Sequence, residues 1–82
     1  MSDEPKLMLV DDETSILDTL QVLFRGEGYR VVVAETGQKA IDALESEKPD
    51  LVVSDIRMPG KTGLDVLAAV REIDPELPVI LM

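Results

Sequence analysis

The stretch LVVSDIRMPGKTG, residues 51–63, decides the fold. Its first four residues, 51–54, suit a buried strand because they are β-branched, apolar or small. Asp55 follows directly, and a Met-Pro-Gly turn at 58–60 then breaks the backbone. A carboxylate at the end of a buried strand is either a helix cap or loop acid, or a reacting group displayed on the edge of a sheet. The rest of the sequence distinguishes these two interpretations.

Segments of strand length alternate with helical patterns along the chain. The predicted strands are 6–10 (KLMLV), 31–34 (VVVA), 51–54 (LVVS) and 79–82 (VILM). Strands that alternate with helices predict a parallel sheet with right-handed crossovers. The strands are apolar throughout, which is typical of a sheet covered on both faces. We therefore predict a three-layer, flavodoxin-like α/β fold with the strand order 2-1-3-4.

Each of the three predicted helices presents an apolar face to the sheet. The first face comprises Ile16, Leu17, Leu20, Leu23 and Phe24. The second comprises Ala40, Ile41 and Leu44. The third comprises Leu64, Leu67, Val70 and Ile73. We expect Thr14 or Ser15 to cap the first helix, Thr36 to cap the second, and Gly26 or Gly28 to end the first.

The composition indicates one small domain and excludes several classes of function. The chain has 82 residues, 45% of them hydrophobic, which suits a domain with a modest core. It contains no His and no Cys, so imidazole bases, thiolate nucleophiles and zinc sites built from those ligands are excluded. The net charge of −9 argues against a nucleic-acid surface, which needs clustered Lys and Arg.

The sequence contains no pattern typical of a membrane or secreted protein. Residues 1–6, MSDEPK, are polar and unlike a secretory signal. No apolar run approaches the roughly 18 residues that a membrane helix requires. We therefore expect no membrane contact and a cytoplasmic location.

Acidic residues follow two of the predicted strands at the point where each ends. Asp11 and Asp12 follow the strand at 6–10, and Asp55 follows the strand at 51–54. In the order 2-1-3-4 these strands are neighbours at the switch point of the sheet, where open α/β folds bind ligands. Three carboxylates so close would repel strongly, and Mg²⁺, a hard cation that prefers oxygen ligands, would relieve the repulsion. An Asp carboxylate can also attack a phosphoryl group.

These motifs resemble the receiver domain of two-component response regulators. DDE at 11–13 and SDIRMPGKTG at 54–63 are similar to the paired motifs of that family. The resemblance continues through GYRVVVAETGQKAIDAL at 28–44 and PELPVILM at 75–82. Within the family, DIRMPGKTGLDVL at 55–67 is most similar to receivers of bacterial enhancer-binding activators of transcription.

The resemblance implies a signalling module rather than an enzyme, and it implies a role for each acid. Asp55 would be the phosphoacceptor. Asp12 and Asp55 would bind Mg²⁺ directly, with the Arg57 carbonyl as a third protein ligand, and Asp11 would act through a metal-bound water. The phosphoryl donor would be a phosphohistidine of a sensor histidine kinase, or a small phosphodonor molecule.

The resemblance also implies that residues 1–82 are the N-terminal part of a receiver domain. Family members have a fifth strand and two further helices, a Ser or Thr after the fourth strand and a Lys at the end of the fifth. Without those elements, apolar faces of strands 51–54 and 79–82 would lie open, and 79–82 would form a hydrophobic edge. We therefore predict that this chain self-associates, as a homodimer or a larger assembly.

Two other functions stay open. An aspartyl-phosphate enzyme of the haloacid dehalogenase type would need a second Asp two residues after its nucleophile, and Arg57 stands at that position. A phosphorylation-incompetent interaction fragment would keep the acids without taking up phosphate. Covalent phosphate on Asp55 would distinguish a receiver from such a fragment, whereas Mg²⁺ binding alone would not.

Overall fold

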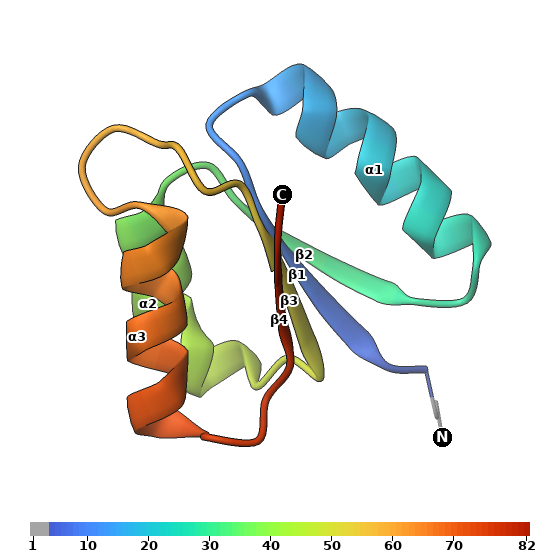
Figure 1. Ribbon diagram of the computed structural model, residues 1–82. Helices are drawn as coiled ribbons and strands as arrows, with labels where there is room; N and C mark the ends of the chain where they lie inside the picture. Colours follow the sequence, from blue (N-terminus) through green and yellow to red (C-terminus); the bar gives the residue numbers. More distant parts are fainter. Residues whose placement is uncertain (1–3) are drawn as a thin grey trace.

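The computed structural model describes residues 4–82, which form three layers around a parallel sheet. The sheet has four strands in the order β2-β1-β3-β4. Helix α1 covers one face, and α2 and α3 cover the other (Figure 1). The strands are β1 (Lys6–Val10), β2 (Arg30–Ala34), β3 (Leu51–Ser54) and β4 (Val79–Leu81), and the helices are α1 (Thr14–Gly26), α2 (Gly37–Glu47) and α3 (Gly63–Ile73).

This arrangement confirms the predicted element order, the parallel pairing and the strand order. The first three residues of the polar N-terminal stretch at 1–6, which is unlike a secretory signal, lie outside the described residues.

The two faces of the sheet build two apolar clusters, because successive side chains on a strand point to opposite faces. Met8 and Val10 of β1 pack toward α2 and α3. Leu7 and Leu9 pack toward α1. All four side chains are buried, and burial of each contributes about 1.5–3 kcal/mol to folding before the entropic cost is counted. The central strand β1 therefore anchors both layers.

The cap prediction is confirmed for α2 and wrong for α1. The Thr36 hydroxyl accepts a hydrogen bond from the Lys39 backbone N–H at 3.0 Å. In α1 the N-cap is Glu13, whose side chain makes no capping hydrogen bond. The Asp11 carboxylate accepts from the Glu13 backbone N–H at 2.9 Å and turns the chain there, so the helix begins one or two residues earlier than predicted and Thr14 lies inside it. The predicted end at Gly26 is confirmed.

The predicted apolar face of α1 is only partly correct. Leu17 is buried, and Leu20 and Phe24 pack against the same cluster. Leu23 is 58% exposed, and Ile16 is also exposed. Only α1 lies on this side of the sheet among residues 4–82, so no neighbouring helix covers its flank.

The predicted face of α3 is rotated relative to the observed one. Val66 and Val70 are buried, whereas Leu64 is 59% exposed and Ile73 is also exposed. The reason lies at the start of the helix, where Gly63 packs closely against the backbone of the preceding loop. That contact points the 63–66–70 side of the helix inward, because residues three and four apart share a face.

A capping box begins α3 and makes its stability dependent on pH. The Thr62 backbone N–H donates to Asp65 Oδ2 at 2.8 Å, and the Asp65 backbone N–H donates to Thr62 Oγ1 at 3.4 Å. The hydrogen bond from the Thr62 backbone lowers the pKa of Asp65. Desolvation opposes this, and the Thr62 hydroxyl and the Lys61 charge reinforce it. A lowered folded-state pKa adds stability above the unfolded-state pKa, and that stability is lost as pH falls through the folded-state value.

We expect Asp65→Asn to lower the free energy of unfolding at neutral pH, because asparagine removes the charge that the Thr62 backbone N–H stabilises. The difference from the parent chain should shrink as pH falls below about 4, the unfolded-state pKa of an aspartate, and should be lost once pH falls below the lowered folded-state pKa of Asp65. Urea unfolding across this pH range measures the difference. Thr62→Ala, which keeps the backbone donor, should retain most of the dependence. A difference that stays constant or grows in acid would contradict the assignment.

Candidate functional site

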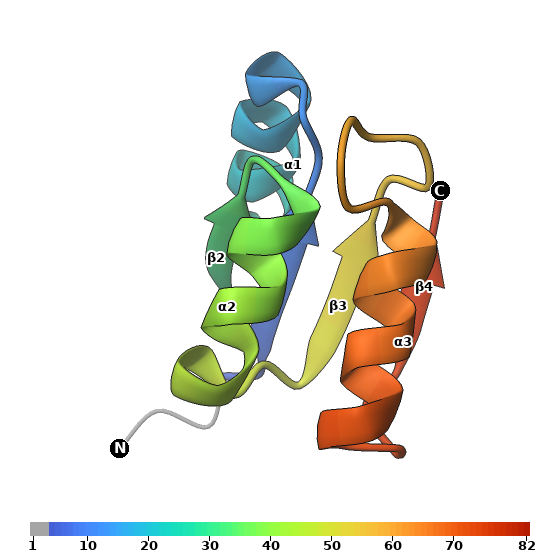
Figure 2. The ribbon, with the colours of Figure 1, turned by 90° about the vertical axis from the view of Figure 1, so that its left-hand side faces the viewer.

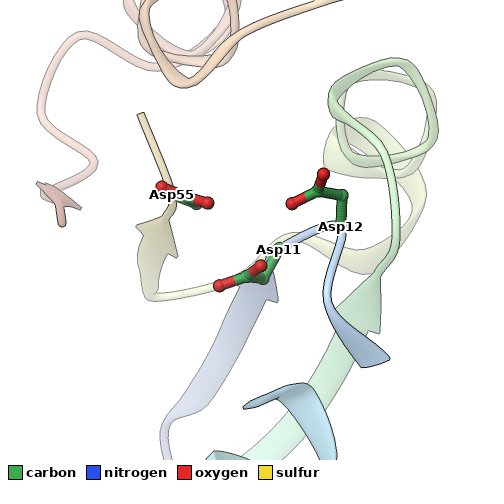
Figure 3. A group of neighbouring side chains, drawn as sticks. All are labelled: Asp11, Asp12 and Asp55. Atoms are coloured by element: carbon green, nitrogen blue, oxygen red, sulfur yellow. The ribbon is translucent and has the colours of Figure 1, made fainter. Parts of the chain in front are cut away.

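Three aspartates converge at the carboxyl edge of the sheet. The chain of β1 runs into Asp11 and Asp12, and β3 runs into Asp55. Parallel pairing aligns the two strand ends, and the Asp55 backbone N–H donates to the Val10 carbonyl at 2.8 Å. Carboxylate oxygens of the three residues all lie within 4.8 Å of one another (Figure 3). The structure therefore brings together the three acids that the sequence pattern predicted to meet.

The three side chains differ in environment. Asp11 is 4% exposed, and its Oδ1 accepts from the Glu13 backbone N–H at 2.9 Å. Asp55 is half-buried, and its Oδ1 accepts from the Arg57 backbone N–H at 3.3 Å. Asp12 is exposed, and its carboxylate points toward that of Asp55 (Figure 3). Asp11 is thus the most buried member of this cluster of three carboxylates, which we call the acidic pocket, and Asp12 is the most exposed.

No side-chain cation among residues 4–82 balances this charge. Lys6 Nζ pairs with Glu47 Oε1 at 3.3 Å at the opposite end of β1, and no ion pair to Asp11, Asp12 or Asp55 is found among residues 4–82. Two unit charges about 5 Å apart repel by roughly 1 kcal/mol in water and by several times as much near a protein surface. The metal-free pocket therefore destabilises the fold, and a bound cation would remove this cost.

The donor set fits a small, hard divalent cation. All the donors are oxygens, which are the ligands that Mg²⁺ prefers. Ligand oxygens on an octahedral Mg²⁺ lie about 3–4 Å apart, given metal–oxygen distances of about 2.1 Å. One oxygen from each carboxylate lies within 4.8 Å of the others, so the three residues are close enough to share one such cation. Arg57 lies in the loop beside them with an exposed side chain, and a ligand role for its carbonyl stays a prediction.

Two residues that the sequence analysis did not single out shape the acceptor loop, residues 55–62. Ser54 is fully buried, and its hydroxyl donates to the Asp55 carbonyl at 2.9 Å. Gly63 lies against the start of the same loop, where a Cβ would meet the Asp55 carbonyl oxygen and the Ile56 Cα, the latter at 2.9 Å. The sequence features that could have pointed to these residues are a hydroxyl side chain at the end of an otherwise apolar strand and a glycine at the first position of a helix.

Comparison with known proteins agrees with this geometry. A family model described as the response regulator receiver domain matches residues 7–82. The transcriptional regulatory protein GlrR of Escherichia coli is 41% identical across the whole chain. This chain spans only 19% of that regulator's length.

Two solved structures share the fold. The chemotaxis protein CheY4 of Vibrio cholerae superposes with a TM-score of 0.91 at 29% identity, covering 95% of this chain and 67% of that one. The response regulator protein TrrA of Thermotoga maritima, in complex with Mg(2+)-BeF, has a TM-score of 0.89 at 36% identity, covering 94% of this chain and 67% of that one.

The family match, the sheet order and the acidic pocket are mutually consistent. The match extends over nearly the whole chain and, among residues 4–82, covers every strand and helix except for Lys6, the first residue of β1. Among residues 4–82, no helix has the length and apolar character needed to span a bilayer. The chain belongs to the response regulator receiver domain family.

Proposed function

We propose that this chain is the phosphoacceptor module of a two-component response regulator and that Asp55 takes the phosphoryl group. One observation carries the proposal, namely the convergence of Asp11 and Asp12 on Asp55 within 4.8 Å. A loop acid with no such role would have no reason to lie beside two further carboxylates, because their repulsion destabilises the fold. Membership of the receiver family supports the same assignment.

The chemical step is phosphoryl transfer to a carboxylate. An Asp55 carboxylate oxygen attacks the phosphorus of the donor, and a new O–P bond forms. The bond between the donor and phosphorus breaks, and the leaving group keeps the electron pair. Acetyl phosphate releases acetate. Phosphohistidine releases the imidazole side chain, whose nitrogen takes up a proton and becomes neutral. The product is a mixed anhydride on Asp55, and no oxidant or reductant is needed.

Each residue of the pocket has a separate task in this step. The Arg57 backbone N–H holds one oxygen of Asp55 and thereby orients the carboxylate. Asp12 and Asp55 would bind Mg²⁺ directly, with the Arg57 carbonyl as a third protein ligand, and Asp11 would hold a metal-bound water. When bound, Mg²⁺ would neutralise the charge that develops on the phosphoryl oxygens. The similar TrrA structure is a complex with Mg(2+)-BeF, which supports a Mg²⁺ site in this chain.

The natural donor is proposed to be a phosphohistidine on a sensor histidine kinase, and the response a change in transcription. The similarity to GlrR, a transcriptional regulatory protein, supports such an output. Residues 1–82 would then be the N-terminal part of a receiver domain that acts through other parts of a longer protein. This segment would not contact nucleic acid directly, because its net charge is −9.

Intact mass spectrometry tests the proposal. Incubation of the chain with acetyl phosphate and Mg²⁺ should add about 80 Da, the mass of one phosphoryl group. Hydroxylamine, which cleaves acyl phosphates, should remove it. A chain that binds Mg²⁺ and gains no mass would instead support the phosphorylation-incompetent interaction fragment.

The 82-residue chain is also predicted to self-associate through β4. Among residues 4–82, that strand pairs with β3 alone. Its Ile80 side chain is 51% exposed, and Met82, which follows the strand, is 50% exposed. Open apolar edges promote pairing between chains. Light scattering at micromolar concentration should show a dimer or larger species, and Ile80→Lys should shift it toward monomer. A monomeric parent chain would exclude this prediction.

A further inference from the structure

The first turn of α2 lies directly against the acceptor loop (Figures 1 and 2). Gly37, the first residue of α2, is buried there. A Cβ on Gly37 would meet the Lys61 carbonyl oxygen and would lie 2.8 Å from Lys61 Cβ and 2.9 Å from the Lys61 carbonyl carbon. Real Cβ atoms essentially never approach other heavy atoms closer than 3.0 Å. Glycine is therefore the residue that allows α2 and the loop to come this close.

Backbone conformation does not explain this glycine. The glycines with positive φ among residues 4–82 are Gly28 and Gly60, so Gly37 adopts a conformation open to any residue. The close contact with Lys61 is therefore the feature of the structure that calls for glycine at position 37.

The start of α3 has the same construction. Both helices begin with a Thr-Gly pair, at 36–37 and 62–63, in which the threonine is the N-cap and the glycine is the first helical residue. Gly63 approaches the acceptor loop at Asp55, and Gly37 approaches it at Lys61. The loop that carries Asp55 is therefore held near both of its ends by helix starts that lack a side chain.

We infer that Gly37 is a positioning residue that holds the acceptor loop in place through the Lys61 backbone. The three atoms nearest to a Cβ at position 37 all belong to Lys61 and not to the carboxylates, so the effect of Gly37 on the pocket is indirect. The part of the inference that concerns metal affinity rests on the proposed function. A side chain at position 37 would push the loop away from α2, and the loop would carry Asp55 away from Asp12. Metal sites tolerate displacements of only about 0.5 Å.

The test compares Gly37→Ala with Gly26→Ala. Gly26 is the last residue of α1, and a Cβ there would meet no atom within 4 Å, so it is a matched control in open space. The first measurement is amide hydrogen exchange without metal. The Gly63 amide, which donates to the Ile56 carbonyl at 3.0 Å, reports loop closure. The Lys39 amide, which donates to the Thr36 hydroxyl, reports the α2 cap.

We expect Gly37→Ala to accelerate exchange at Gly63 and to leave Lys39 unchanged after correction for global unfolding. The second measurement is the Mg²⁺ dissociation constant by calorimetry, which should rise about tenfold, as for other residues that orient metal ligands. A residue that only supports folding would lower the folded fraction without changing the dissociation constant of the folded molecules. Unchanged Gly63 exchange, or exchange that rises at Lys39 instead, would overturn the inference.

A second variant keeps the test decisive if Gly37→Ala does not fold. Lys61→Gly removes the Lys61 Cβ and lets the Lys61 carbonyl turn away from position 37. The double variant should recover most of the parental Gly63 exchange and Mg²⁺ affinity, and failure to recover would exclude the contact as the cause. If the parent chain bound no Mg²⁺, the proposed metal site would fail, while the exchange measurements would still decide the role of Gly37.

Discussion

Asp55→Asn should abolish the uptake of phosphate from acetyl phosphate, leaving the mass of the chain unchanged. The amide of asparagine is a far weaker nucleophile than a carboxylate, although it has nearly the same shape. The fold should survive, because Asp55 is only half-buried and asparagine can still accept a hydrogen bond from the Arg57 backbone. Intact mass spectrometry with Mg²⁺ and acetyl phosphate measures the loss.

Asp18→Asn is the matched control for this variant. It makes the same chemical change on the exposed surface of α1, so the gain of about 80 Da should persist. If Asp55→Asn also kept a hydroxylamine-sensitive gain, another carboxylate would be the acceptor. Asp12, the exposed neighbour of Asp55, would then be the residue to replace next.

Local signals predicted the elements of the fold well and the orientation of its helices less well. The Thr36 cap and the buried Ala40 follow from patterns within a few residues, and the structure confirms both. The rotation of α3 does not follow from such a pattern. Its helix offers Leu64 and Val66 as alternative inward positions, and the choice depends on how closely Gly63 approaches the loop. That approach is a tertiary contact, which periodicity does not encode.

The acidic pocket was predictable because it depends on topology alone. Strand order places the ends of β1 and β3 side by side, and the sequence places acids directly after both strands. The contacts that fix the acceptor loop were not predictable in the same way. A Thr-Gly pair indicates a helix start, but the closeness of Gly37 to Lys61 appears only once α2 and the loop are placed together.

Asp12→Asn should change the stability of the chain in opposite directions with and without Mg²⁺. In chelator the variant should be more stable, because it removes one of three mutually repelling carboxylates. The expected gain is roughly 1–2 kcal/mol, because Asp12 faces two other carboxylates and each pair of unit charges about 5 Å apart repels by roughly 1 kcal/mol in water. Asp12 is exposed and is not among the residues whose hydrogen bonds shape the pocket, so little else is lost.

In Mg²⁺ the parent chain should be more stable than Asp12→Asn, the reverse of the order expected in chelator. A cation that binds only the folded state stabilises it by RT ln(1 + [Mg²⁺]/Kd). Loss of a direct ligand should weaken binding by at least about a hundredfold, the upper end of the loss for residues that only orient a ligand, which removes at least about 2.7 kcal/mol of that gain at saturation. Urea unfolding in chelator and across a Mg²⁺ series measures both effects, with Asp18→Asn as the control for charge removal elsewhere.

Salt separates the electrostatic cause from any change in packing. The screening length falls from about 10 Å at 0.1 M to about 3 Å at 1 M, so the advantage of the variant in chelator should shrink as NaCl is added. An Asp12→Asn chain that is less stable than the parent in chelator would show that repulsion does not dominate the pocket. A chain whose response to Mg²⁺ is unchanged would show that Asp12 is not a ligand. The reversal needs both properties, because only a carboxylate that repels its neighbours and also binds the cation lowers stability without metal and raises it with metal.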